Sequence, residues 1–288
     1  MIKIENIIKF KNVRYQKPSF SETKKSKYIL KNINLNIKKG EFVCIMGANG
    51  CGKSTLAKHF NGLLLPSQGD VIIGDKNTKN SKDNLEIKKN VGMIFQNPES
   101  QIVACTVEEE IAFGMENLFF SREKMKKNIK KALQDVNLTG YEKTSTYFLS
   151  GGEKQRLAIA SVLAMEPKIL ILDEPTSMLD DKSKKQIFDL ILKLTKKQGI
   201  TVILITHFIQ EALYSNRTVV MNNGSVTAFG NTEDIISDIN LLKNNKLVPT
   251  ESAYILNFLK SKGYNVDLKA YSNESCAKQI LKILGSIK

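Results

Sequence analysis

A glycine-rich segment, Gly47–Thr55, has the residue types and spacing of a loop that holds a triphosphate. It lies between an apolar strand pattern and a helical pattern. Glycines let backbone N–H groups curl around phosphates, Lys53 can neutralise the β- and γ-phosphate oxygens, and Ser54 can offer an oxygen to Mg²⁺. The order of strand, loop and helix disfavours a chance glycine-rich turn. The sequence therefore predicts nucleotide contacts from Gly47, Asn49, Gly50, Cys51, Gly52, Lys53, Ser54 and Thr55.

Two acidic residues close an apolar strand pattern further along the chain. Asp173 and Glu174 follow Ile169–Leu172. In an open α/β sheet, the carboxyl ends of the strands are where ligands bind. Asp173 suits Mg²⁺, bound through water, and Glu174 suits polarisation of an attacking water. The alternative is a pair of solvated acids at a strand end, which the upstream phosphate loop disfavours.

Three other side chains end predicted strands. His207 follows Val202–Ile205 and can reach a γ-phosphate, whereas His59 lies within a helical pattern and is assigned to structure. Gln96 can contact metal and water through its amide, although on its own this residue decides nothing. Tyr15 ends the first strand, where an aromatic ring can stack on adenine; an isolated tyrosine more often packs at the surface.

A second cluster suited to phosphate is Leu149–Arg156. Ser150, Gly151 and Gly152 precede a helical pattern, and the exposed N–H groups of a helix N-terminus attract anions. The chain already has a complete phosphate loop. One of the two phosphate-facing surfaces must then serve a partner, so we expect an active site built from two chains.

The elements that must position these residues alternate between strands and helices, as in an α/β sheet domain. Strands are predicted over Ile7–Tyr15, Ile29–Ile37, Phe42–Met46, Val71–Ile73, Val91–Phe95, Ile169–Leu172 and Val202–Ile205. Helical patterns cover Ser54–Leu65, Thr106–Tyr147, the stretch from Leu149 through Leu163, Ile235–Leu242, Tyr254–Leu259 and Cys276–Leu284. Residues 16–27 are interpreted as an exposed hairpin insert.

Composition indicates an ordinary globular protein of 288 residues, with 42% apolar and 25% charged residues. No apolar run approaches the ~18–20 residues that span a bilayer, and no signal peptide is expected. The four scattered cysteines indicate reduced cytosolic thiols.

A net charge of +14 raises nucleic acid as a partner, but the lysines are spread along the chain. We therefore favour a solvated surface, with weak attraction to an anionic membrane as a third interpretation.

Together these motifs resemble the ATP-binding cassette (ABC) family. The matching segments occur in family order over roughly residues 3–230: the phosphate loop Gly47–Thr55, the glutamine loop at Gln96, the signature Leu149–Arg156, the Walker-B strand Ile169–Glu174, the loop Ser177–Asp180 and the switch His207. The resemblance implies an α/β fold, a P-loop NTPase nucleotide-binding domain over residues 1–230. An inserted helical subdomain is expected at about 97–165 and a small C-terminal helical domain at 231–288.

The resemblance also implies an ATPase that works as a head-to-tail dimer, with two ATP molecules and Mg²⁺ between the subunits. Each ATP would contact Lys53, Ser54, Gln96, Asp173, Glu174 and His207 of one chain, and Ser150 and Gly152 of the other, with Gly151 beside them. Asp180 would couple the two sites across the interface. Mg²⁺ would be held by Ser54, Gln96 and Asp173, and catalysis carried by Glu174, His207, Gln96 and Lys53.

A narrower resemblance is to the energy-coupling-factor transporter ATPases, the cobalt and nickel importer type. It rests on the helical tail after residue 230 and on Ser54–His59, Asn61–Leu63, Val91–Pro98, Gln101–Ala104, Thr106–Gly114 and Leu163–Pro167. The loop Ser177–Asp180 is most like the first of the two paired ATPases, although the insert at 16–27 favours the second. The resemblance implies a subunit that drives uptake of a vitamin or a transition-metal ion, peripheral on the cytoplasmic face of the cell membrane.

Three partners, and no nucleic acid, follow from this resemblance. The first is a second ABC ATPase, for which we favour a related non-identical chain and keep a second copy of this chain as the alternative. The others are a polytopic scaffold that docks near Gln96–Glu110 and, indirectly, a substrate-binding membrane protein. Glu108–Glu110 could meet basic residues of the scaffold or simply suit a helix N-terminus. A soluble cassette ATPase acting on DNA or the ribosome, and the ATPase of a conventional ABC transporter, stay as alternatives.

Two positions depart from the family pattern. Glu153 stands where glutamine is common and adds negative charge near the shared phosphate site. Cys51 stands where serine is common. With Lys53 close and a helix N-terminus next to it, the thiol of Cys51 is expected to have a depressed pKa and to be protected from alkylation by nucleotide. The alternative is a small residue that merely fits the loop.

Overall fold

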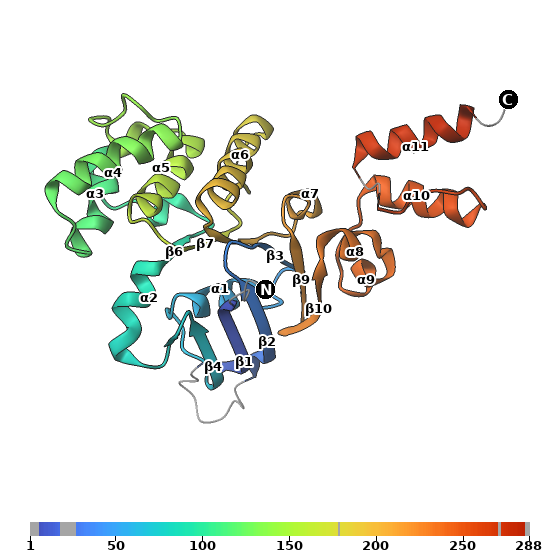
Figure 1. The fold of residues 1–288 in the computed structure, drawn as a ribbon, viewed down its shortest axis with the longest axis horizontal. Helices are drawn as coiled ribbons and strands as arrows, with labels where there is room; N and C mark the ends of the chain where they lie inside the picture. Colours follow the sequence, from blue (N-terminus) through green and yellow to red (C-terminus); the bar gives the residue numbers. More distant parts are fainter. Residues whose placement is uncertain (1–5, 18–26, 178, 270–271, 286–288) are drawn as a thin grey trace, which may run out of the picture. The chain divides into compact units, whose positions relative to one another are not determined.

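The computed structural model describes residues 6–17, 27–177, 179–269 and 272–285 (Figure 1). Its contacts divide the chain into two units. The first comprises Met1–Phe42 and Ser54–Ile205, and the second comprises Val43–Lys53 and Thr206–Lys288. The chain therefore passes between the units three times: after Phe42, after Lys53 inside the predicted phosphate loop, and after Ile205. The domain boundary that we expect after residue 230 stays a prediction.

An antiparallel sheet in the first unit has the strand order β2-β1-β4-β5. Its strands are β1 (Asn6–Gln16), β2 (Tyr28–Lys38), β4 (Gln68–Ile73) and β5 (Lys76–Asn77). Ile8 and Phe10 of β1 are buried, and the rings of Phe10 and Phe60 lie 4.8 Å apart. The first two predicted strands are thus confirmed. Most of the expected hairpin insert, residues 18–26, lies outside the described residues.

Parallel strands of the first unit run in the order β6-β7-β8. They are β6 (Val91–Ile94), β7 (Ile169–Asp173) and β8 (Thr201–Ile205). Every residue of these strands is buried, as their continuous apolar runs predict. Helix α6 (Asp181–Gln198), which the sequence patterns did not predict, contacts β8 and ends at Gly199 in the left-handed conformation.

Helix α1 (Lys53–Phe60) begins at the end of the phosphate loop. The helix predicted to continue to Leu65 is wrong at its end. Gly62 has φ +71°, and the Leu64 N–H donates to the Lys58 carbonyl at 3.0 Å, a closure that terminates a helix. A 3₁₀ turn (Ser81–Asp83) and α2 (Asn84–Asn90) follow β5. In α2 only Ile87 is buried, so its apolar pattern was too weak to predict it.

Helices α3 (Val107–Asn117), α4 (Arg122–Asp135) and α5 (Gly151–Ala164) pack side by side in the first unit (Figure 1). Ile111 and Met115 of α3 and Leu133 of α4 are buried. Short 3₁₀ turns precede α3 (Pro98–Ser100) and α5 (Thr146–Phe148). The helical pattern predicted up to Tyr147 is therefore too long, because α4 ends at Asp135.

The second unit contains β3 (Phe42–Gly47, of which Phe42 is counted with the first unit), β9 (Arg217–Asn222) and β10 (Ser225–Asn231). Strand β3 is parallel to β9, and β9 is antiparallel to β10. Asn223 and Gly224, both with positive φ, form the turn between β9 and β10. The sequence patterns predicted neither β9 nor β10.

Helix α7 (Ile209–Ala212) precedes β9, and the chain after β10 is helical: α8 (Thr232–Ser237), α9 (Ile239–Asn244), α10 (Glu251–Ser261) and α11 (Asn273–Gly285). The single helix predicted over Ile235–Leu242 is broken at Asp238, whose carboxylate caps α9 at the Leu241 N–H. Helices α10 and α11 lie side by side around buried Leu256 and Cys276 (Figure 1). Among the described helices, none combines the length and the apolar character needed to cross a membrane.

Candidate active site

The phosphate loop leaves β3 at Gly47, where the backbone is tightly enclosed. A Cβ at this position would lie 2.4 Å from the Met221 carbonyl oxygen, so no larger residue fits without a shift. Gly50 adopts φ +74°, a conformation that favours glycine. The Cys51 N–H donates to the Ala48 carbonyl at 3.2 Å and closes the loop on itself. The glycines predicted to shape the loop do so.

Lys53 is buried at the end of this loop. Its ammonium donates to the Gly47 carbonyl at 2.7 Å and to the Ala48 carbonyl at 3.3 Å. These neutral acceptors hold a positive charge inside the curl of the loop. Charge-assisted bonds to phosphate oxygens are stronger than bonds to neutral carbonyls, so an incoming anion can draw the ammonium away.

The environment of Cys51 contradicts the expected depression of its thiol pKa. Burial raises the pKa of its thiol, and the nearby Lys53 ammonium, which lowers the pKa, does not outweigh that effect. The side chain is 6% exposed. The predicted depressed pKa is therefore wrong, and the observed environment is that of a small residue that fits the loop.

The rate at which Cys51 is alkylated should reflect the burial of its thiol. At pH 7.5, N-ethylmaleimide should modify the exposed Cys105 at least about tenfold faster than Cys51, because Cys51 is buried and burial raises the pKa of its thiol. Peptide mass spectrometry over time measures both rates in one sample. Equal rates would contradict the assignment, and the variant Cys105→Ser isolates the slower reaction.

His207 belongs to the second unit and is half-buried. The residue before it, Thr206, donates its N–H to the Ile45 carbonyl of β3 at 3.2 Å. The Thr206 hydroxyl donates to Glu211 at 2.5 Å and accepts from the Phe208 N–H at 3.0 Å. The turn that carries His207 is thus fixed to the strand that carries the phosphate loop.

In the first unit, Ser54 and Asp173 meet as a pair of oxygen ligands. The Ser54 hydroxyl donates to the Asp173 carboxylate at 3.4 Å, and Asp173 is 5% exposed at the end of β7. A hydroxyl and a carboxylate are hard oxygen donors of the kind that Mg²⁺ prefers. The residues present therefore fit the implied metal.

Glu174 follows Asp173 and is bonded to the glutamine loop. The Gln96 amide donates to the Glu174 carboxylate at 2.8 Å. Glu174 has φ +49°, an uncommon conformation for a residue with a side chain and one that occurs at functional sites. Its N–H donates to the Ile205 carbonyl of β8 at 2.9 Å. In this unit the structure brings together Ser54, Gln96, Asp173 and Glu174.

The signature segment begins α5 with a capping box. The Ser150 hydroxyl accepts from the Glu153 N–H at 3.3 Å, and the Glu153 carboxylate accepts from the Ser150 N–H at 2.8 Å and from its hydroxyl at 2.7 Å. These bonds hold the pKa of Glu153 below its ordinary value. Tyr141 also hydrogen-bonds to this carboxylate, which raises the pKa of the phenol. Sequence reasoning missed Tyr141, because no motif marks it.

Comparison with known proteins decides the family. The family model described as ABC transporter matches residues 30–177. The energy-coupling factor transporter ATP-binding protein EcfA1 of Clostridium novyi (strain NT) is 45% identical over 265 residues, which cover 91% of this chain and 93% of that protein. The chain belongs to the ABC transporter family.

Within the ABC family, the similarity is to energy-coupling-factor ATPases. The EcfA2 protein of Clostridium tetani (strain Massachusetts / E88) is 40% identical over 99% of this chain and 98% of its own length. The structure of CbiO1 from Clostridium perfringens, described as part of the ABC transporter complex CbiONQ, matches with a TM-score of 0.73 and 35% identity over 83% of this chain and 94% of that one. The dimeric ATP-binding cassette MJ0796 bound to ADP and Pi matches with a TM-score of 0.71 and 33% identity, covering 78% of this chain and 98% of that one. This chain is an ABC ATPase of the energy-coupling-factor type, and the predicted fold class is confirmed.

Asp180 of this ABC ATPase has a local structural role. Its carboxylate caps α6 by accepting from the Ser183 N–H at 2.7 Å, and these bonds lower its pKa. Met178, in the same loop, lies outside the described residues.

Tyr15 is 9% exposed, and its ring meets the buried His59 ring edge-on at 4.9 Å. His59 bonds the Thr55 carbonyl of its own helix at 2.7 Å, in keeping with the structural role assigned to it.

The acidic trio at the start of α3 is fully engaged inside this ABC ATPase. Glu108 pairs with Lys143, and Glu109 completes a capping box with the N–H of Thr106. Glu110 is 5% exposed and accepts from two backbone N–H groups, each at 2.9 Å. These bonds support the helix-start interpretation of the trio.

Removing the buried member of this trio should destabilise the fold. Glu110→Ala leaves the N–H groups of Val103 and Ala104 without their acceptor, so the free energy of unfolding should fall by ~2–4 kcal/mol. Glu108→Gln, the matched control at an exposed ion pair, should lower it by less than ~1 kcal/mol. Urea denaturation measures both, and equal losses would contradict this assignment.

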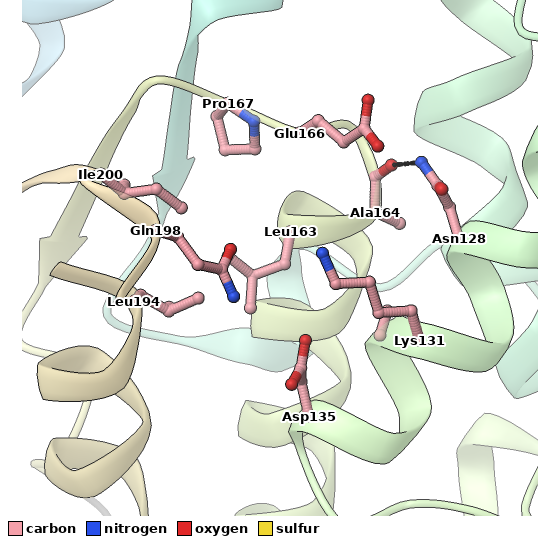
Figure 2. Close-up of a pocket in the computed structure, with 11 residues that line it drawn as sticks. Asn128, Lys131, Asp135, Leu163, Ala164, Glu166, Pro167, Leu194, Gln198 and Ile200 are labelled. Atoms are coloured by element: carbon pink, nitrogen blue, oxygen red, sulfur yellow. Dashed lines mark hydrogen bonds between the residues drawn. The ribbon is translucent and has the colours of Figure 1, made fainter. Parts of the chain in front are cut away.

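A cavity of about 280 Å³ opens in the first unit between α4, the end of α5 and the end of α6 (Figure 2). Lys131 and Asp135 line it from α4, and Gln198 from α6. Asn128 closes one side by donating to the Ala164 carbonyl at 2.8 Å. None of the predicted site residues lines this cavity, so it is not part of the predicted ATP site.

Proposed function

We propose that this chain is the ATP-hydrolysing subunit of an energy-coupling-factor importer, bound peripherally at the cytoplasmic face of the membrane, that drives uptake of a vitamin or a transition-metal ion. The observation that carries the hydrolytic part is the placement of Ser54 and Gln96 against Asp173 and Glu174 in one unit. Metal ligands and a candidate base lie on neighbouring residues, as hydrolysis of a magnesium-bound triphosphate needs.

The nucleotide is proposed to bind through the loop that ends at Lys53, and Tyr15 is proposed to stack on the adenine. The phosphate contacts come from Gly47, Asn49, Gly50, Cys51, Gly52, Lys53, Ser54 and Thr55. When bound, Mg²⁺ would neutralise charge on the phosphates, held by Ser54, Gln96 and Asp173.

In the hydrolytic step, Glu174 accepts a proton from the attacking water. The water oxygen bonds to the γ-phosphorus while the bond from that phosphorus to the β–γ bridging oxygen breaks, and ADP keeps the bridging electron pair. Gln96 orients Glu174 through the bond already present in the structure. His207 and Lys53 stabilise the charge on the γ-phosphate.

A second ATPase is proposed to complete each site. Ser150, Gly151 and Gly152 of one chain would face the nucleotide of the other, and Asp180 would couple the two sites. We favour a related non-identical chain as the partner, because relatives with two different names, EcfA1 and EcfA2, both match this chain; a second copy of this chain is the alternative. A polytopic scaffold would dock near Gln96–Glu110 and connect the pair to a substrate-binding membrane protein.

Docking can be tested by affinity purification from detergent-solubilised membranes. The full chain should retain a second cassette ATPase and a polytopic protein in near-equal amounts. Val103, 64% exposed in the docking segment, should be sensitive: Val103→Asp should reduce recovery of the polytopic protein at least about fivefold, since it places a charge in an apolar contact. Leu85→Asp, at a residue 63% exposed on α2, is the matched control and should leave recovery unchanged. Equal recovery with both variants would contradict docking at this segment.

A further inference from the structure

The signature serine of this chain is already bonded to a charged group of the same helix. Both hydrogens that Ser150 can donate, on its backbone nitrogen and on its hydroxyl, point to the Glu153 carboxylate at 2.8 and 2.7 Å. A hydroxyl has a single proton to donate. Any other acceptor that approaches Ser150 must therefore displace Glu153.

The carboxylate is held in this position from a second direction. Tyr141, in the segment before α5, hydrogen-bonds to Glu153, and the positive charge of Arg156 lies near enough to act on it. Ser150 and Gly151 are exposed, whereas Glu153 is half-buried. An anion that approaches Ser150 is therefore repelled by the negative charge of the Glu153 carboxylate bonded to it.

We propose that Glu153 restrains Ser150 and repels phosphate, so that this chain's signature captures the partner's ATP more weakly than a signature with a neutral residue at this position. This role rests on the proposed function, in which one chain's signature completes the other chain's ATP site. In a pair whose other ATPase carries a neutral residue at this position, it makes the two composite sites unequal. The site completed by this signature then needs the higher ATP concentration to close.

Glu153→Gln separates the charge from the cap. Glutamine also serves at this position of a capping box, because its carbonyl oxygen can accept from the same N–H and hydroxyl. Glu153→Ala removes both the charge and the cap, and should destabilise α5. The neutral variant therefore tests repulsion, and the alanine variant reports the structural contribution.

The experiment measures ATP-driven association of the full chain in a Glu174→Gln background, by light scattering over a range of ATP concentrations. Glu153→Gln should lower the half-maximal ATP concentration about fivefold at low salt. The difference should shrink at about 0.5 M salt, because exposed charges are screened. Glu123→Gln removes an exposed carboxylate in the first turn of α4, outside the residues assigned to ATP or to docking, and should leave the half-maximal concentration unchanged.

A separate titration of each monomer with a fluorescent ATP analogue distinguishes the possible failures. Loss of binding in all proteins would contradict the proposed function itself. If binding is normal, the same half-maximal concentration with and without the Glu153→Gln substitution would overturn the role of Glu153. No association of either protein would contradict a composite site formed by two copies of this chain. If Glu153→Gln lowers the half-maximal ATP concentration equally at low and at high salt, that result would overturn charge repulsion as the cause of the effect.

Discussion

Glu174→Gln is expected to lower the rate of ATP hydrolysis about 10²- to 10⁴-fold, the range that a general base contributes. A neutral amide cannot take the proton from the attacking water. It can still accept the hydrogen bond that Gln96 now donates at 2.8 Å, so the geometry of the site should persist. The variant should bind ATP normally and remain associated in its presence. Phosphate release and light scattering measure the two effects.

Asp181→Asn provides the control for this prediction. Asp181 is an exposed acid in the first turn of α6, outside the set of residues assigned to ATP. Its variant should hydrolyse ATP at the normal rate. Full turnover by Glu174→Gln, or equal losses in both variants, would contradict the role given to Glu174.

Lys53→Ala is expected to weaken ATP binding about 10²-fold or more. Lys53 is 6% exposed, and its ammonium donates to the carbonyls of Gly47 and Ala48 within the phosphate loop. Removing one member of a buried pair of charges costs ~2–5 kcal/mol. Equilibrium titration with a fluorescent ATP analogue measures the loss directly.

Lys58→Ala tests whether the loss at Lys53 is specific. Lys58 lies on the same helix but is exposed, so its variant should bind ATP as the parent chain does. The unfolding transition of each variant shows whether the fold is retained. Normal ATP binding by a folded Lys53→Ala protein would contradict the assigned site.

The residues that carry the chemistry could be predicted from sequence because each follows a buried strand. Asp173 and Glu174 come after the apolar run of β7, and Gln96 comes after β6, so continuous apolar runs located them. The structure then placed Gln96 against Glu174 within one unit. A local apolar pattern is sufficient to locate a functional residue when that residue directly follows a buried strand.

Other features depend on contacts between distant residues and could not be derived in this way. The state of Cys51 was misjudged because the proximity of Lys53 is visible in sequence, whereas burial is not. Glu153 was seen as an added charge, but its bond to Tyr141 arises only when the segment before α5 folds back. The β9–β10 hairpin was not predicted, although Asn223 and Gly224 are typical turn residues, because the pairing of β9 with β3 is a contact between distant residues.

The central claim is that this chain both gives a signature to a partner and receives one. Mixing two inactive variants tests it most directly: Lys53→Ala keeps the signature, and Gly152→Asp keeps the phosphate loop. Each variant alone should hydrolyse ATP at less than about 1% of the parent rate, since every site it forms lacks one half. An equimolar mixture should recover about a quarter of the parent rate, because one site in the mixed pair is intact. Where the parent chain hydrolyses ATP on its own, a mixture no more active than the two variants measured separately would contradict the claim.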